Sequence, residues 1–111
     1  MEPFSSSILN HNTEPTAYPP DRSHAFFPLN INYVWTSAVD DRVFFAAAGQ
    51  SQTDLQTSVQ PSQLDAPFYP NYALADTPLE RMYGTNVGKL RALKKKVDPS
   101  NAMGLAGGFK F

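Results

Sequence analysis

The residues best suited to chemistry in this sequence lie close together at Tyr69, Asn71 and Tyr72. A carboxamide offers N–H donors and a carbonyl acceptor to a planar heterocyclic ligand. A phenol can orient a substrate or assist the removal of a proton. An asparagine between tyrosines gains little by packing, which favours a binding role for Asn71. The alternative interpretation is a packed aromatic edge strand that holds no ligand.

A second group of polar side chains is a basic run on one expected helix, formed by Lys89, Arg91, Lys94, Lys95 and Lys96. The run alternates with apolar residues that suit core positions, and no motif for base or phosphate recognition accompanies it. We therefore interpret the run as a solvated helix face and expect no nucleic-acid partner. The net charge of -1 agrees, because it creates no global attraction to a polyanion.

Several other classes of site find no support. The sequence has no cysteine, and neither His11 nor His24 has ligand-type residues at metal-binding spacing, so we expect no metal. No nucleophile elbow, phosphate-binding loop or dinucleotide-binding glycine pattern is present. No apolar run reaches the roughly 18 residues that span a bilayer, and no secretory signal opens the chain. We therefore expect no membrane association of this chain, while its cellular location stays open.

The last third of the chain carries an ordered signature, formed by Tyr69, Asn71, Tyr72, Tyr83, Gly84, Asn86, Leu90, Lys94, Asp98, Pro99 and Asn101. This signature resembles the C-terminal region of the berberine-bridge-type FAD-linked oxidoreductases. In that family an aromatic-x-Asn-Tyr strand precedes a Tyr-Gly-x-Asn helix and an Asp-Pro-x-Asn turn. The ending Met103–Phe111 is similar to the tail of the fungal branch. Pro70 departs from the aliphatic residue that is more common at its position.

The resemblance implies the C-terminal part of an FAD-linked oxidoreductase that oxidises a small organic substrate in specialised (secondary) metabolism. It implies a catalytic role for Tyr69 and cofactor contacts for Asn71 and Tyr72. The N-terminal FAD-binding domain of the family has no counterpart in these 111 residues. We therefore expect neither tight FAD binding nor activity from this chain alone.

Several origins and roles remain open for such a chain. It is a truncated gene product, the product of a mispredicted gene, or one half of a split enzyme whose FAD domain is a separate chain. The alternative function is a non-catalytic remnant or interaction protein that binds a full-length homologue or a split partner.

The expected fold class is α+β, a fragment of an antiparallel sheet with helices on one face. Residues 1–24 are expected to be a proline-rich irregular lead-in. Residues 25–64 predict a strand and a long helix from the substrate domain. Residues 65–111 form the berberine-bridge-like C-terminal segment.

The strand is predicted over 25–36, where Leu29, Ile31 and Tyr33 alternate with polar residues. The long helix is predicted from Ser37, as N-cap, to about Val59.

The C-terminal segment predicts a short or edge strand over 65–76, because two prolines interrupt it. Thr77 to Glu80 has the pattern of a capping box, which predicts the start of a helix. That helix is predicted to be interrupted at Gly84 and to end with lysines before the turn at Asp98.

Overall fold

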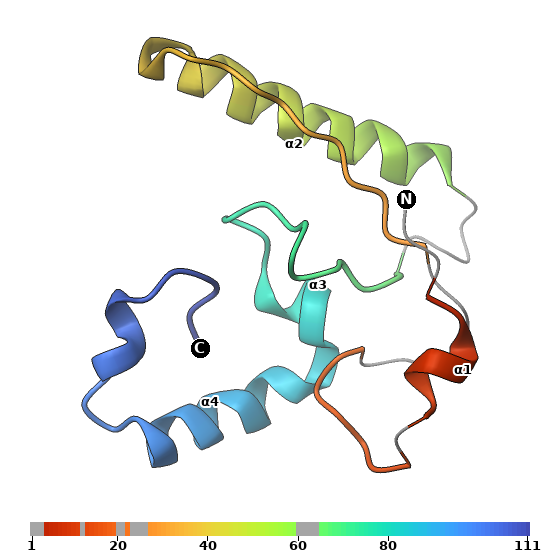
Figure 1. The fold of residues 1–111 in the computed structure, drawn as a ribbon, viewed down its shortest axis with the longest axis vertical. Helices are drawn as coiled ribbons and strands as arrows, with labels where there is room; N and C mark the ends of the chain where they lie inside the picture. Colours follow the sequence, from red (N-terminus) through yellow and green to blue (C-terminus); the bar gives the residue numbers. More distant parts are fainter. Residues whose placement is uncertain (1–3, 12, 20–21, 23–26, 60–64) are drawn as a thin grey trace.

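The computed structural model describes residues 4–11, 13–19, 22, 27–59 and 65–111. Its elements are α1 (Ser6–Leu9), η1 (Ala38–Asp40), α2 (Asp41–Ser58), α3 (Leu79–Tyr83), η3 (Gly84–Asn86), α4 (Val87–Val97) and η4 (Ala102–Leu105), where η denotes a 3₁₀ helix. Figure 1 shows α2 on one side of the molecule and α4 on the other, with α3 between them.

The predicted antiparallel sheet is wrong. The described ranges contain no strand, and Phe4 forms only an isolated bridge. Residues 27–36 instead run as an elongated coil beside α2 (Figure 1). The alternating pattern of Leu29, Ile31 and Tyr33 is compatible with a strand, but a strand is stable only when a neighbour completes its ladder. No described segment supplies that neighbour, and Ala25 and Phe26 of the predicted strand lie outside the described residues.

Side chains rather than backbone ladders join this coil to α2. The Trp35 ring stacks on Phe44 with centroids 4.9 Å apart and planes 5° from parallel. The Trp35 Nε1–H donates to Asp41 Oδ1 at 2.6 Å, and the Tyr33 and Ser51 hydroxyls lie 2.5 Å apart. These contacts set the coil antiparallel to the helix.

The long helix itself is confirmed, with η1 as its first turn. Ser37 occupies the N-cap position of η1, as predicted, but its side chain makes no cap hydrogen bond.

The helical part of the C-terminal segment follows the prediction in outline. Gly84 ends α3 with φ 54° and ψ −133°, a combination that favours glycine, so the predicted interruption is confirmed. The predicted capping box is wrong, because α3 begins only after Pro78, whose ψ of 136° is not helical. Thr77 therefore stands too far from the first turn to cap it. It is buried, and its Oγ1 has no hydrogen-bond partner among the described residues.

The core is small. Met82, fully buried, and Val87, 4% exposed, are the buried apolar residues other than proline in the described part of the chain. The radius of gyration is 16.1 Å, compared with about 13 Å for a compact domain of similar length. Within the described ranges, no helix combines the length and hydrophobicity that crossing a membrane requires. The molecule is therefore loosely packed, with its core at the α3–α4 junction.

Candidate functional site

The segment from Tyr69 to Tyr72 is a turn and not the short strand that the sequence predicts. The N–H groups of Tyr72 and Ala73 both donate to the Tyr69 carbonyl oxygen, at 2.9 and 3.0 Å. Pro70 fits the second position of such a turn because its ring fixes φ near the required value. The same proline has no N–H for a sheet ladder. Pro70 therefore explains why this segment forms a turn and not the predicted strand.

The turn brings the three predicted site residues together. The Asn71 Nδ2 donates to the Tyr69 phenol oxygen at 2.8 Å, and the Tyr72 ring meets the Tyr69 ring edge-on at 5.0 Å. Asn71 is exposed. Within the described residues, no further hydrogen bond engages its amide, so one N–H and the carbonyl oxygen remain available to a ligand.

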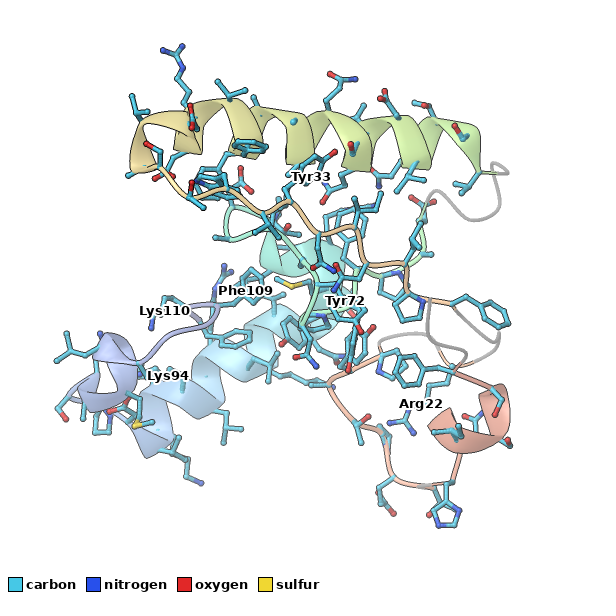
Figure 2. All side chains as sticks on the ribbon, turned by 45° about the horizontal axis from the view of Figure 1, so that its top comes forward. Arg22, Tyr33, Tyr72, Lys94, Phe109 and Lys110 are labelled. Atoms are coloured by element: carbon cyan, nitrogen blue, oxygen red, sulfur yellow. The ribbon has the colours of Figure 1, made fainter. Side chains whose placement is uncertain are left out.

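Tyr69 also belongs to a larger aromatic cluster, which consists of Phe4, Tyr18, Tyr69, Tyr72, Tyr83 and Phe111. Tyr18 lies at its centre, 6.0 Å from the Tyr69 ring and 6.2 Å from the Tyr83 ring. Phe111 reaches Tyr83 at 5.3 Å. Figure 2 shows Tyr72 in the middle of the molecule, where these segments meet. The cluster therefore ties the lead-in, the turn, α3 and the tail to one another.

The tyrosines at the centre of the cluster are neutral groups. Burial raises the pKa of the Tyr18 phenol, and the neighbouring Tyr69 and Tyr83 raise it further. Burial also raises the pKa of Tyr83. Both phenols stay protonated at neutral pH, so they pack as neutral rings and do not serve as bases.

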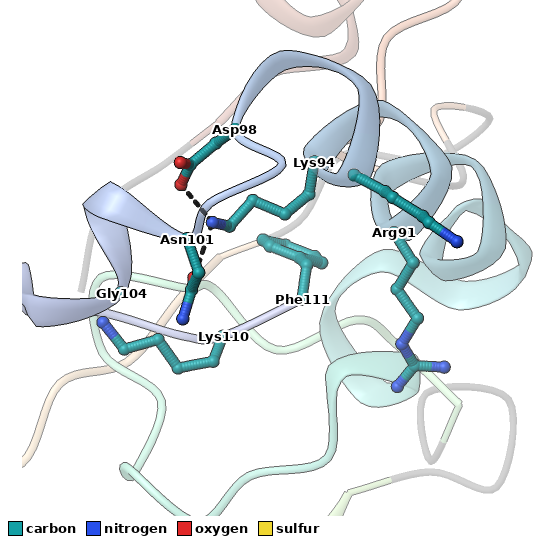
Figure 3. Close-up of a pocket in the computed structure, with 8 residues that line it drawn as sticks. Arg91, Lys94, Asp98, Asn101, Gly104, Lys110 and Phe111 are labelled. Carbon is teal, nitrogen blue, oxygen red and sulfur yellow. Dashed lines mark hydrogen bonds and ion pairs between the residues drawn. The ribbon is translucent and has the colours of Figure 1, made fainter.

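A second polar cluster closes the turn after α4. The Asp98 carboxylate accepts hydrogen bonds from the Lys94 ammonium and from the N–H groups of Ala102 and Met103, the last two at 2.7 and 3.1 Å. Lys94 Nζ also donates to Asn101 Oδ1 at 2.7 Å (Figure 3). The hydrogen bond from Lys94, together with those from the two N–H groups, lowers the pKa of Asp98. These signature residues hold the chain reversal in place.

The predicted site lies on open surface. Two cavities in the described part of the chain have volumes of about 320 and 160 Å³, and neither is lined by Tyr69, Asn71 or Tyr72. The turn therefore offers one polar and aromatic edge and does not enclose a cofactor by itself.

The remaining candidates are not part of this turn. Lys89, Lys95 and Lys96 are exposed, as a solvated helix face requires. His11 is also exposed, His24 lies outside the described residues, and no metal-holding group of acidic, histidine or cysteine side chains occurs within the described ranges.

Reasoning from the sequence missed Tyr18, because its proline-rich surroundings indicated an irregular loop. The signal available in the sequence was the size of the Tyr18 side chain, because a large aromatic ring in a proline-rich segment is suited to anchor that segment. In the structure the next residue, Pro19, is buried. It also missed Phe111, which follows a glycine-rich stretch.

Comparison with known proteins identifies one region. Residues 68–105 match the family model described as "Berberine and berberine like". The match contains the whole signature from Tyr69 to Asn101, so the predicted resemblance is confirmed for this segment. No curated protein and no solved structure matches the chain.

Proposed function

We propose that this chain serves as the C-terminal part of an FAD-linked oxidoreductase whose FAD-binding domain is carried by another chain. The observation that supports it most is the match of residues 68–105 to the berberine-like family, because it includes all three site residues. The proposed substrate is a small organic molecule of specialised metabolism.

The exposed turn suits one edge of a flavin ring. Asn71 has a free N–H and carbonyl oxygen, and Tyr72 stands next to it, so these two residues would contact the cofactor. Tyr69 would orient the substrate, since Asn71 fixes the position of its phenol oxygen. When bound, FAD would supply the chemistry by accepting a hydride from a substrate carbon.

Incomplete burial supports the need for a second chain. The exposed large apolar residues are most frequent in the coil and the helix of residues 27–59, including Phe27, Ile31, Val34, Val43 and Phe45. A surface of this kind marks a place where another protein surface docks. An FAD-binding domain would cover part of it and enclose the open edge of the turn.

Co-expression with an FAD-binding domain of the family tests the proposal. We expect the chain alone to be colourless and the complex to absorb near about 450 nm, as oxidised flavins do. In the complex, Asn71→Ala should slow flavin reduction by about 100-fold, because losing a donor to developing charge costs on the order of 3 kcal/mol. Asn32→Ala is the matched control, since Asn32 is also an exposed asparagine but belongs to the coil of residues 27–36 and not to the turn.

Two results would count against this assignment. A yellow chain with stoichiometric flavin in the absence of any partner would contradict the need for a second chain. A lower melting temperature of Asn71→Ala with an unchanged rate per bound flavin would make Asn71 a structural residue only.

The second candidate function is a non-catalytic interaction protein that binds a full-length homologue. The exposed apolar residues favour it equally well, because they require a partner but not chemistry. Turnover separates the two candidates: the complex with a homologue would form without any rate that depends on Asn71. An FAD-domain reading frame directly upstream in the genome would favour the split enzyme.

A further inference from the structure

A basic pocket lies between α4 and the C-terminal tail. Arg91, Lys94 and Lys95 line it from α4 and Lys110 from the tail, and Asp98 is the carboxylate among the lining side chains. Its volume is about 320 Å³, within the range of small-ligand sites. Figure 3 shows the Phe111 ring between Lys94 and Arg91, where it forms an apolar wall.

The charge balance of this basic pocket is positive. Four cations and one carboxylate line it, which gives a sum of 4 − 1 = +3. The C-terminal end of α4 contributes about −0.5. Glu80, 3.6 Å from Arg91, subtracts one more charge, and an α-carboxylate on Phe111 would subtract another. The sum remains positive, so the pocket still favours an anion.

The floor of the pocket is preorganised. Lys94 is fixed by Asp98 and Asn101. A Cβ atom at Gly104 would overlap the Asn101 side chain, so a larger residue there would displace the asparagine from Lys94.

The other cations differ in how far they are already engaged. Lys110 donates to the Ala106 carbonyl oxygen. Lys95 is exposed, and no hydrogen bond or ion pair engages its ammonium group in the described part of the chain. Lys95 is therefore the cation most ready to bind a ligand.

We propose that this basic pocket binds a small phosphate dianion, either inorganic phosphate or the phosphate group of a small organic ester. Charge-assisted hydrogen bonds from lysine and arginine to phosphate oxygens are short and strong, and the cations here come from two segments that converge on one volume. The Phe111 ring would contact the organic part of an ester. This site is separate from the turn at Asn71 and stands independently of the proposed function.

Calorimetric titration of the full chain, on an N-terminal solubility tag, tests the proposal with inorganic phosphate and with phenyl phosphate. We expect saturable binding of one ligand, absent from the tag alone. The double variant Lys95→Gln/Lys110→Gln should weaken it by at least about tenfold, since it removes two charge-assisted hydrogen bonds. Tighter binding of phenyl phosphate would identify an ester as the ligand, and equal affinity would identify free phosphate.

The matched control is Lys89→Gln/Lys96→Gln, which removes two charges from the same helix outside the pocket lining. It should leave the affinity unchanged. Should the first double variant lose helical circular dichroism, the single charge reversal Lys95→Glu replaces it and should abolish binding. Equal losses in the two double variants, no saturable binding, or tighter binding to a single-stranded oligonucleotide than to either phosphate would overturn the proposal, because each indicates diffuse surface charge.

Discussion

Two regions of this molecule are held together in different ways. The C-terminal region, residues 65–111, is joined by backbone and core contacts: the Phe68 N–H donates to the Arg81 carbonyl at 2.9 Å, and the Arg81 guanidinium lies 4.8 Å from the centre of the Phe68 ring. Met82 and Val87 are buried there. The α2 hairpin, residues 27–59, is joined by the contacts of Tyr33 and Trp35, and none of the 18 residues of α2 is buried.

The two regions also differ in how much apolar surface each buries within this chain. The family match covers most of the C-terminal region, where the turn, α3 and α4 pack on one another. In the α2 hairpin, Val34 is 85% exposed and Phe45 60% exposed, so its apolar surface gains little stabilisation within this chain. Burial within this chain therefore stabilises the hairpin less than it stabilises the C-terminal region, where Met82 and Val87 are buried.

The largest effect should come from Met82→Ala. Truncating this fully buried side chain should lower the free energy of unfolding by about 3 kcal/mol, because it leaves a cavity in a small core. Urea titration followed by far-ultraviolet circular dichroism measures the change. Val43→Ala in α2 is the control, since Val43 is 67% exposed and its loss should cost less than about 0.5 kcal/mol. Equal costs at the two positions would remove the distinction between the regions.

An intermediate effect should appear in acid. The pKa of Asp98 is lowered from its ordinary value of 3.8 in the folded chain, so its contribution is complete above that value and is lost as pH falls through the lowered pKa. We expect the C-terminal region to lose stability below about pH 4, and the α2 hairpin to be unaffected by this group. Hydrogen exchange of the α4 and η4 amides at several pH values measures it. In the Asp98→Asn variant this loss of stability in acid should disappear. An unchanged dependence of stability on pH would mean that another carboxyl group causes the loss.

The smallest effects should come from two glycines. A Cβ atom at Gly88 in α4, or at Gly49 in α2, would meet no atom within 4 Å, so alanine fits both positions without strain. Alanine favours a helix over glycine by about 0.5–1 kcal/mol. Gly88→Ala should therefore raise the urea midpoint of the C-terminal region. Gly49→Ala should raise helix content without moving that midpoint, and a shift of equal size would mean that the two regions unfold as one.

Local signals explain which features of the chain could be predicted. Gly84 interrupts the helix because its conformation suits glycine, and Asp98 reverses the chain through contacts with neighbours in sequence. The predicted strand over 25–36 is wrong because a strand forms only when a second strand pairs with it, and the alternating pattern of residues does not reveal whether that second strand exists. The predicted cap at Thr77 is wrong because the helix begins only after Pro78. The role of Tyr18 could not be predicted because it depends on contacts with Tyr69 and Tyr83, which are distant in sequence. At the site, the positions of Tyr69, Asn71 and Tyr72 relative to one another follow from Pro70, a local effect.

The stacking of Trp35 on Phe44 places the indole ring against α2, and the aromatic chromophores of the molecule are unevenly distributed between the two regions. Trp35 is the single tryptophan of the chain, and of the five tyrosines only Tyr33 lies in the α2 hairpin. When the sample is excited at wavelengths that tyrosine does not absorb, the fluorescence comes from Trp35 and reports the environment of the hairpin alone. A partner that covers the hairpin would change the colour and lifetime of that emission while the tyrosines near Asn71 remained spectrally silent.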